Sequence, residues 1–257
     1  MTEAELVLAQ VRDQVLYVTI NRPEKRNALA RRVLDAMADC FRAHAGRPDL
    51  KAAVLTGAGT KSFAAGGDLK ELEPLKTATE AAAMAGHARR ALDQVRRFPV
   101  PVVAALNGDA LGGGAELAIA ADFRVAAAGA RIGFVQGRLN IATAWGGGLD
   151  LMALVGPNRG LAILCRAELL DAEAARALGL IDAVAAEDLA AAVERFLAPI
   201  RRQAPQVLRA FKGVALNARL GRDRGEAEDV ETRLFSAAWI HDDHWRAAAR
   251  ILAPSKG

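Results

Sequence analysis

The chain has 257 residues, of which 52% are hydrophobic and 25% are charged, and its formal net charge is +4. This is an ordinary globular composition, and no run of about 18 apolar residues predicts a membrane span. The positive charge does not indicate a nucleic-acid-binding protein, because basic pairs such as Arg96-Arg97 and Arg201-Arg202 are scattered among acids and aromatic residues make up only 5%. We therefore expect neither a membrane nor nucleic acid as a partner.

The N-terminal sequence and the cysteines favour a cytoplasmic protein. MTEAELVLAQ has no basic segment before an apolar core, so it does not resemble a secretory signal. Cys40 and Cys165 lack metal-ligand spacing and lie in apolar helical patterns, which predicts two reduced core thiols. The four histidines, likewise, form no metal-ligand set.

The first hundred residues are predicted to alternate between strands and helices. Alternating apolar and polar residues over 5–11 and 15–20 predict a β-hairpin. The remaining elements expected here are a helix over about 29–43, a strand over 52–56, a tight loop of small residues over 61–69 and a helix over 75–97.

The stretch 98–121, FPVPVVAALNGDALGGGAELAIAA, predicts a strand, a glycine loop and the start of a helix. Glycines at 112–114 let a ligand approach the main chain closely. The first amides of a helix lack intrahelical partners and carry partial positive charge, so they suit an oxygen that is becoming negative. The alternative is a turn used only for packing. A phosphate loop is not favoured, because the Lys-Ser/Thr ending is absent.

The remainder divides into a second part of the α/β region and a helical region. Strands are expected over 123–127, 131–134 and 181–184, helices up to about 165 and over 171–178, and glycine turns at 137–140 and 145–148. From residue 189 the pattern is helical throughout. We therefore predict an α/β core over 1–188 and a helical C-terminal region over 189–257.

Four stretches in this order resemble the crotonase (enoyl-CoA hydratase/isomerase) superfamily: NRPEKRNAL, FAAGGDL, PVVAALNGDALGGGAELAIAADFRVA and LLDAEAARALGLIDAV. The resemblance covers nearly the whole chain. It implies an α/β fold built as a spiral of ββα units, with a C-terminal helical region that forms homotrimers, commonly paired into hexamers. It also implies an enzyme that binds an acyl-CoA thioester and stabilises its enolate. Coenzyme A is then part of the substrate, and no separate cofactor or metal is expected.

The resemblance assigns roles to individual residues. The backbone amides of Gly67 and Gly113 would form the oxyanion site, and Glu116 would be a catalytic carboxylate. The positions that match the CoA and acyl-binding parts are Arg26, Ala28, Leu29, Ala64, Ala65, Asp68, Leu69 and Trp145. Two alternatives stay open: Glu116 could merely favour the helix N-terminus, and Trp145 could simply pack beneath its glycine loop.

The second catalytic carboxylate is replaced. Hydratases of this family place another Glu 20 residues after the first, where this chain has Gln136. A neutral amide can orient water or substrate but cannot transfer a proton at neutral pH. The loop Ala144-Trp145-Gly146-Gly147 resembles that of decarboxylase branches. The best label is an enoyl-CoA hydratase/isomerase (a lyase), with Glu116 as acid/base and Gln136 orienting. A malonyl-type CoA decarboxylase and a CoA-binding protein without turnover are the alternatives.

Overall fold

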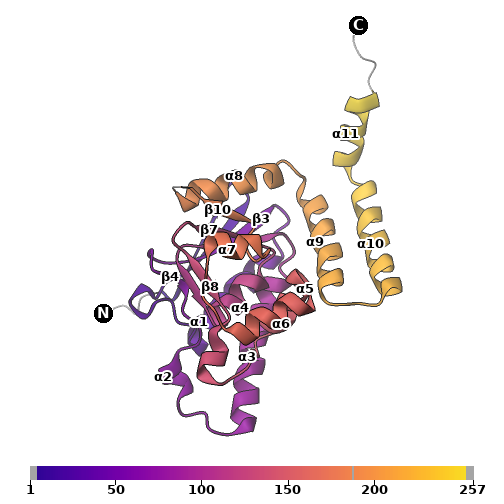
Figure 1. Cartoon of the computed structure of the whole chain (residues 1–257). Coiled ribbons are helices and arrows are strands. Elements are labelled where there is room, and N and C mark those ends of the chain that lie inside the picture. The colour runs from indigo at the N-terminus through magenta and orange to yellow at the C-terminus, as the bar shows by residue number, and fades with distance from the viewer. Residues whose placement is uncertain (1–4, 187, 253–257) are drawn as a thin grey trace.

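The computed structural model describes residues 5–186 and 188–252 of the chain. Figure 1 shows an α/β body from which the last helices extend. The larger sheet has six strands in the order β1 (Val7–Arg12), β2 (Val15–Ile20), β3 (Ala52–Gly57), β5 (Val102–Leu106), β7 (Phe123–Ala127) and β10 (Ala183–Ala185). The predicted hairpin is confirmed, because β1 and β2 pair antiparallel with Val7 opposite Ile20. The other neighbouring strands pair parallel.

A smaller sheet positions the glycine loops. Its strands, in order, are β4 (Ser62–Ala64), β6 (Asp109–Leu111), β8 (Arg131–Gly133) and β9 (Leu170–Asp171). The prediction of an uninterrupted loop over 61–69 was wrong, because Ser62 and Ala64 pair with β6. Since β4 and β6 are parallel, the loops that follow them leave the sheet at the same edge.

Helices flank the sheets. They are α1 (Arg31–Ala45), α2 (Leu69–Leu72), α3 (Ala78–Arg96), α4 (Gly113–Ala120), α5 (Gly147–Val155), α6 (Pro157–Arg166), α7 (Ala172–Ala177) and α8 (Leu189–Arg201), with 3₁₀ turns at Pro23–Lys25 and Val135–Leu139. The helix predicted from residue 75 begins later, because Thr77 and Glu80 form a capping box at its start. Cys165 of α6 is exposed, so the prediction of a core thiol was wrong there, whereas Cys40 is half-buried and packs against the core.

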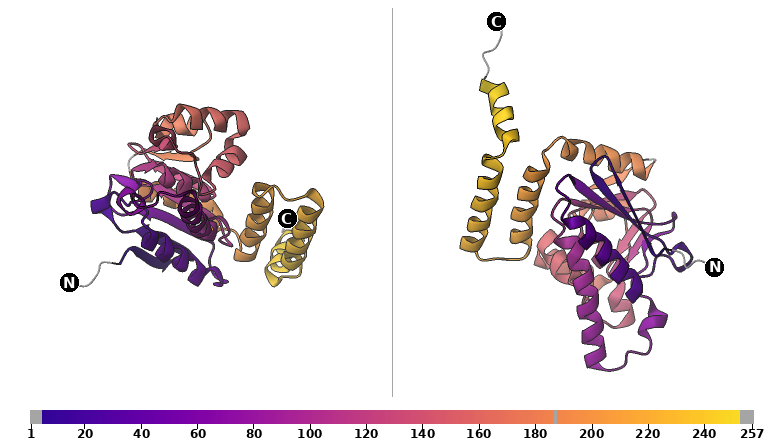
Figure 2. Two further views of the ribbon diagram at one scale, coloured as in Figure 1. Left: turned by 90° about the horizontal axis from the view of Figure 1, so that it is seen from below. Right: turned by 180° about the vertical axis from the view of Figure 1, so that it is seen from behind.

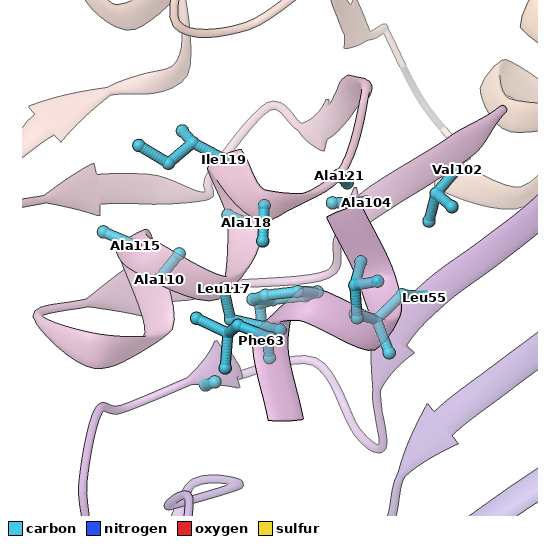
Figure 3. Packing of buried hydrophobic residues seen from close by; sticks show 14 of the residues in the cluster. Leu55, Phe63, Val102, Ala104, Ala110, Ala115, Leu117, Ala118, Ile119 and Ala121 are labelled. Carbon is cyan, nitrogen blue, oxygen red and sulfur yellow. The ribbon is translucent and has the colours of Figure 1, made fainter. Parts of the chain in front are cut away.

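Helix α4 lies inside the core. Every residue from Gly114 to Ala120 is buried. Figure 3 shows Leu117 of this helix beside Phe63 of β4, with Leu55 of β3 nearby. A helix that is apolar on all sides is stable only when other elements surround it, and its alanines allow that close packing. The first turn of α4 is therefore held rigidly within the body.

The C-terminal helices are α9 (Pro205–Arg219), α10 (Arg224–Trp239) and α11 (Asp242–Leu252). In Figures 1 and 2, α9 lies against the body while α10 and α11 stand away from it. Helix α8 instead covers the larger sheet, where Val193 and Leu197 pack against Val54 and Val103. The division at residue 188 stays a prediction. None of the helices described is long and apolar enough to cross a membrane.

Candidate active site

Two glycine loops approach each other at the edge of the smaller sheet. A Cβ added at Gly114 would lie 2.0 Å from the carbonyl oxygen of Ala64, and one at Gly66 would lie 2.9 Å from that of Leu111. Gly66 also has φ +91°, which favours glycine. These contacts explain why the loops after β4 and β6 carry glycines: side chains would hold the two main chains apart.

The backbone amides of Gly67 and Gly113 are free donors. Among the described residues, neither N–H has a hydrogen-bond acceptor. Gly113 is the first residue of α4, where orphan amides and the helix dipole favour negative charge. The indole of Trp145 lies against both glycines, because a Cβ at Gly113 would be 2.3 Å from its Cζ3 and one at Gly67 would be 3.5 Å from its Cη2.

Glu116 lies one turn into α4, and its carboxylate is almost completely buried, with the residue 2% exposed. Its Oε2 accepts hydrogen bonds from the N–H groups of Trp145 (2.9 Å) and Gly147 (2.8 Å). Its Oε1 accepts one from the Nε2 of Gln136 (3.0 Å). A Cβ at Gly147 would lie 2.3 Å from Glu116 Cγ, so a glycine is needed for this contact.

Burial raises the pKa of Glu116 above that of a free glutamate, while the hydrogen bonds from Gly147, Trp145 and Gln136 partly oppose this rise. A general acid/base works best when its pKa lies near the working pH. The burial of Glu116 therefore shifts its pKa in the direction that favours a general acid/base at neutral pH.

Gln136 lies in the 3₁₀ turn after β8, beside Glu116, and one of its two polar side-chain atoms makes no hydrogen bond to the described residues. The residue is 8% exposed, and its Oε1 is buried with no hydrogen-bond partner in the described part of the chain. The orientation of the amide follows from the network, because Nε2 rather than Oε1 must face the carboxylate. A buried acceptor without a donor costs free energy, so Oε1 is suited to receive a hydrogen bond from a ligand.

The segments predicted to hold CoA lie side by side. The N–H of Ala65 donates to the backbone carbonyl of Arg26 (3.1 Å), and the N–H of Leu29 donates to that of Gly66 (2.8 Å). Arg22, which the sequence did not single out, donates to the carbonyl of Ala28 (2.9 Å).

The side chains of these segments differ in their surroundings. Arg22 pairs with the Asp68 carboxylate at 3.2 Å, so this side chain is engaged within the protein. Arg26 likewise contacts the carboxylate of Asp109 at 3.4 Å. Leu29 and Ala64 are buried, whereas Leu69 is 62% exposed at the start of α2.

An apolar cavity of about 340 Å³ adjoins the glycine loops. Leu29 and Trp145 line it and connect it to those loops. The other lining residues come from α1, α2, α3 and the link between α2 and α3: Arg31, Leu34, Glu71, Leu72, Leu75, Glu80, Ala83, Met84, His87 and Ala88. The sequence predicted helices over about 29–43 and 75–97 but gave no sign that their faces enclose a cavity, since an apolar helix face predicts core packing in either case.

Arg96 and Gly147 are further residues of the site that the sequence analysis missed. Gly147 was noted as part of a turn, but not as a donor to Glu116. Arg96 was noted only as a member of a basic pair, but it is 4% exposed and donates to the carbonyl of Trp145 (2.7 Å). No cluster of three metal-ligating side chains occurs within residues 5–186 and 188–252.

Comparison with known proteins places the chain among similar sequences and structures. Residues 10–250 match the family model described as Enoyl-CoA hydratase/isomerase. A crotonyl-CoA hydratase of Syntrophomonas wolfei is 30% identical over 98% of this chain and 96% of its own length. An ethylmalonyl-CoA decarboxylase of Xenopus laevis is 27% identical over 100% and 84%. The crystal structure of an enoyl-CoA hydratase from Bacillus anthracis superposes with a TM-score of 0.88 at 26% identity, covering 96% of this chain and 95% of that one.

Proposed function

Because the chain belongs to the enoyl-CoA hydratase/isomerase family, we propose that it adds water to an enoyl-CoA thioester, or removes water in reverse, with Glu116 as the acid/base. The observation that carries this proposal is the buried Glu116 carboxylate, whose pKa is raised and which lies one helical turn from Gly113. The similarity to a crotonyl-CoA hydratase supports it.

The amides of Gly67 and Gly113 stabilise the charge of the reaction. The thioester carbonyl oxygen binds between their N–H groups, which have no acceptor among the described residues. As the enolate forms, both hydrogen bonds strengthen. Each such donor is worth about 2.7–4 kcal/mol of transition-state stabilisation.

Glu116 and Gln136 handle the water. The ionised carboxylate of Glu116 accepts a proton from a water molecule whose oxygen bonds to the β-carbon of the substrate, and the electron pair of the double bond passes into the enolate. The protonated Glu116 then returns that proton to the α-carbon, giving the 3-hydroxyacyl thioester. Gln136 Oε1, which is left without a partner by residues 5–186 and 188–252, accepts the second hydrogen of the same water.

The remaining predicted residues bind the substrate. The acyl chain enters the apolar cavity beside Trp145 and Leu29. The paired segments 26–29 and 64–69 lie along the pantetheine and adenine of CoA. Coenzyme A enters as part of the substrate, and the chemistry of Glu116 and two amides needs no metal.

Decarboxylation of a malonyl-type CoA thioester is the second candidate. The same oxyanion amides stabilise the enolate left after loss of carbon dioxide, and no base is needed, which suits the neutral Gln136. The similarity to an ethylmalonyl-CoA decarboxylase also favours it. An ionised Glu116 would repel the substrate carboxylate, so this reaction is favoured when Glu116 is protonated or points away from that carboxylate.

Hydration of crotonyl-CoA, followed by the loss of the conjugated-thioester absorbance, tests the proposal. The wild type should hydrate at ordinary enzymatic rates, and Glu116→Gln should abolish this. If the wild type is inert while Gln136→Glu gains activity, hydration is not its reaction, and carbon dioxide release from malonyl-type thioesters is tested next. Binding of acyl-CoA thioesters without turnover of either class would identify a CoA-binding protein.

We further propose that the protein is a homotrimer, or a hexamer of two trimers, located in the cytoplasm. Exposed aromatic side chains on the projecting helices support the assembly: Phe235 and Trp239 of α10 and Trp245 of α11. Large apolar side chains gathered on elements that extend from the body are typical of an interface.

A further inference from the structure

Arg96 is a buried cation at the end of α3 with three fixed contacts. Its Nε donates to Asp150 Oδ2 at 2.6 Å, and its Nη1 donates to Asp93 Oδ1 at 2.9 Å. Its Nη2 donates to the main-chain carbonyl of Trp145 at 2.7 Å. The guanidinium is therefore held in one orientation and directs one of its donors at the turn that follows Ala144.

That turn is the one that holds the Glu116 carboxylate. Trp145 accepts from Arg96 through its carbonyl group and donates through its N–H to Glu116. Between Trp145 and Gly147, the second backbone donor to Glu116, lies Gly146 with φ +92°. A Cβ at Gly146 would lie 2.7 Å from Arg96 Nη2, so the guanidinium packs directly against the turn.

Asp150 and Arg219 complete the network. Arg219, near the end of α9, donates to Asp150 Oδ1 at 2.8 Å, the oxygen that Arg96 leaves free. Arg219 also donates to the carbonyls of Ile119 and Ala120, at the C-terminal end of α4. A cation at this end of a helix is favoured by the dipole. Helix α9 is thus bonded both to Asp150, which holds Arg96, and to α4, which carries Glu116.

We infer that Arg96 is a positioning residue, held by Asp150 and Arg219, which fixes the 145–147 turn so that its two N–H groups face the Glu116 carboxylate. The inference rests on the proposed role of Glu116 as the acid/base. It gives Arg96 a part in the reaction although it touches no substrate: without it, the turn can relax, and Glu116 loses hydrogen bonds that stabilise its ionised form.

Few charged groups lie near Glu116, so a change in its pKa on replacing Arg96 can be measured. In the described part of the chain, no ionised side chain bonds to its carboxylate; Gln136 and the N–H groups of Trp145 and Gly147 do. Charged groups reach the turn from three helices. Helix α3 supplies Arg89, which donates to the Ala144 carbonyl at 2.9 Å, and Arg96 with its partner Asp93. Helix α5 supplies Asp150, and α9 supplies Arg219, which bonds to Asp150. Loss of one hydrogen bond to the charged form should raise the pKa of Glu116 by about one to two pH units.

Infrared difference spectra against Glu116→Gln, recorded across pH, give the titration of the Glu116 carboxyl without requiring turnover. Arg96→Met should shift this titration upward by about one to two pH units. Arg96→Lys, which keeps a positive charge and a hydrogen-bond donor, should shift it less. The matched control is Arg124→Lys. Arg124 is also buried and bonds to Asp182 and to the carbonyls of Leu180, Ala121 and Asp122, but no hydrogen bond joins it to residues 144–147 among the described residues.

The titration should be unchanged in Arg124→Lys. If folded Arg96→Met titrates like the wild type, or if the control shifts equally, Arg96 is only part of the scaffold and the inference fails. Should Arg96→Met not fold, Asp150→Asn and Arg219→Met test the same network, and the same two outcomes decide. If the titration shifts but the wild type does not hydrate enoyl-CoA, the positioning role of Arg96 stands and the hydratase proposal fails. If the wild type hydrates enoyl-CoA but the titration does not shift, the hydratase proposal stands and the positioning role fails.

Discussion

The Nε2 of Gln136 lies 3.0 Å from Oε1 of Glu116, and both side chains are buried. One member of this pair can ionise and the other cannot. Two carboxylates at this distance would share a proton and titrate as a coupled pair. With an amide in the second position, the carboxylate keeps its own titration, and the amide keeps a free acceptor. A single group must therefore both accept and return the proton.

The first prediction concerns the stability of Glu116→Gln. Because burial raises the pKa of Glu116 in the folded state, its contribution to stability is present below the unfolded value of about 4.3 and is lost as pH rises through the folded pKa. The variant lacks this titration. The free energy of unfolding of the variant, minus that of the wild type, should therefore increase as pH rises over this range and then become constant. Denaturant-induced unfolding at several pH values measures it.

Glu80→Gln provides the opposite case. The capping box lowers the pKa of Glu80, so the stability it contributes is present above the unfolded value and is lost as pH falls. The free energy of unfolding of the wild type should therefore increase relative to that of Glu80→Gln as pH rises. Parallel stability curves for wild type and Glu116→Gln would contradict a raised pKa at Glu116.

The second prediction concerns Gly113→Ala. The added Cβ would lie 2.3 Å from the Trp145 ring, so the ring or the start of α4 must move, and the Gly113 N–H would leave its place. The loss of one oxyanion donor should lower kcat by about 10²–10³-fold. Gly129→Ala is the control, because its Cβ would meet no atom of the described residues within 4 Å beyond its chain neighbours. Equal activity in the two variants would remove Gly113 from the oxyanion site.

Local spacing explains which parts of the site the sequence could predict. Gly113 and Glu116 lie within one helical turn, so a glycine loop followed by a helix was enough to place them together. Arg96 is separated from its partners Trp145 and Asp150 by 49 and 54 residues. Nothing in a basic pair near the end of a helix indicates whether it faces solvent or a carbonyl group on another element. Whether Arg96 is buried depends on contacts between segments far apart in the chain, and these contacts cannot be predicted from a single sequence.

The fold shows the same distinction between local and distant information. The hairpin and most helices follow from periodicity, whereas β4 has three residues and no pattern of its own. It is a strand because Ser62 and Ala64 find partners in β6, 45 or more positions later. Asp122 likewise joins distant segments, since its carboxylate accepts from Val102 N–H (2.8 Å) and pairs with Lys212.

The third prediction concerns Trp145→Ala. Removing this buried ring should enlarge the cavity and lower the free energy of unfolding by about 3–5 kcal/mol. The backbone N–H to Glu116 remains, so the ratio of kcat/KM for a bulky enoyl-CoA to that for crotonyl-CoA should rise. Trp145→Phe, which keeps an aromatic ring, should change this ratio less. An unchanged ratio in Trp145→Ala would mean that the ring packs beneath its loop and does not border the acyl chain.

The last prediction concerns assembly through the projecting helices. The ring of Trp239 lies 5.4 Å from that of Phe235 and 5.7 Å from that of Trp245, measured between centroids, and Trp239 is 46% exposed. If these aromatics are anchors of a trimer interface, Trp239→Asp should cost at least about 2 kcal/mol of association energy per interface, because it places a charge in a desolvated contact.

Light scattering on the purified protein measures the result. The wild type should have the mass of a trimer or hexamer, and Trp239→Asp should shift it toward the monomer at low concentration. Leu8→Asp changes an apolar residue of similar exposure, 42%, in β1 of the body, and should leave the mass unchanged. A monomeric wild type, or equal dissociation of both variants, would contradict an interface at α10 and α11. Dissociation of the Trp239 variant alone would assign the exposed aromatic cluster to contacts between subunits, since the two substitutions introduce the same charge at different places.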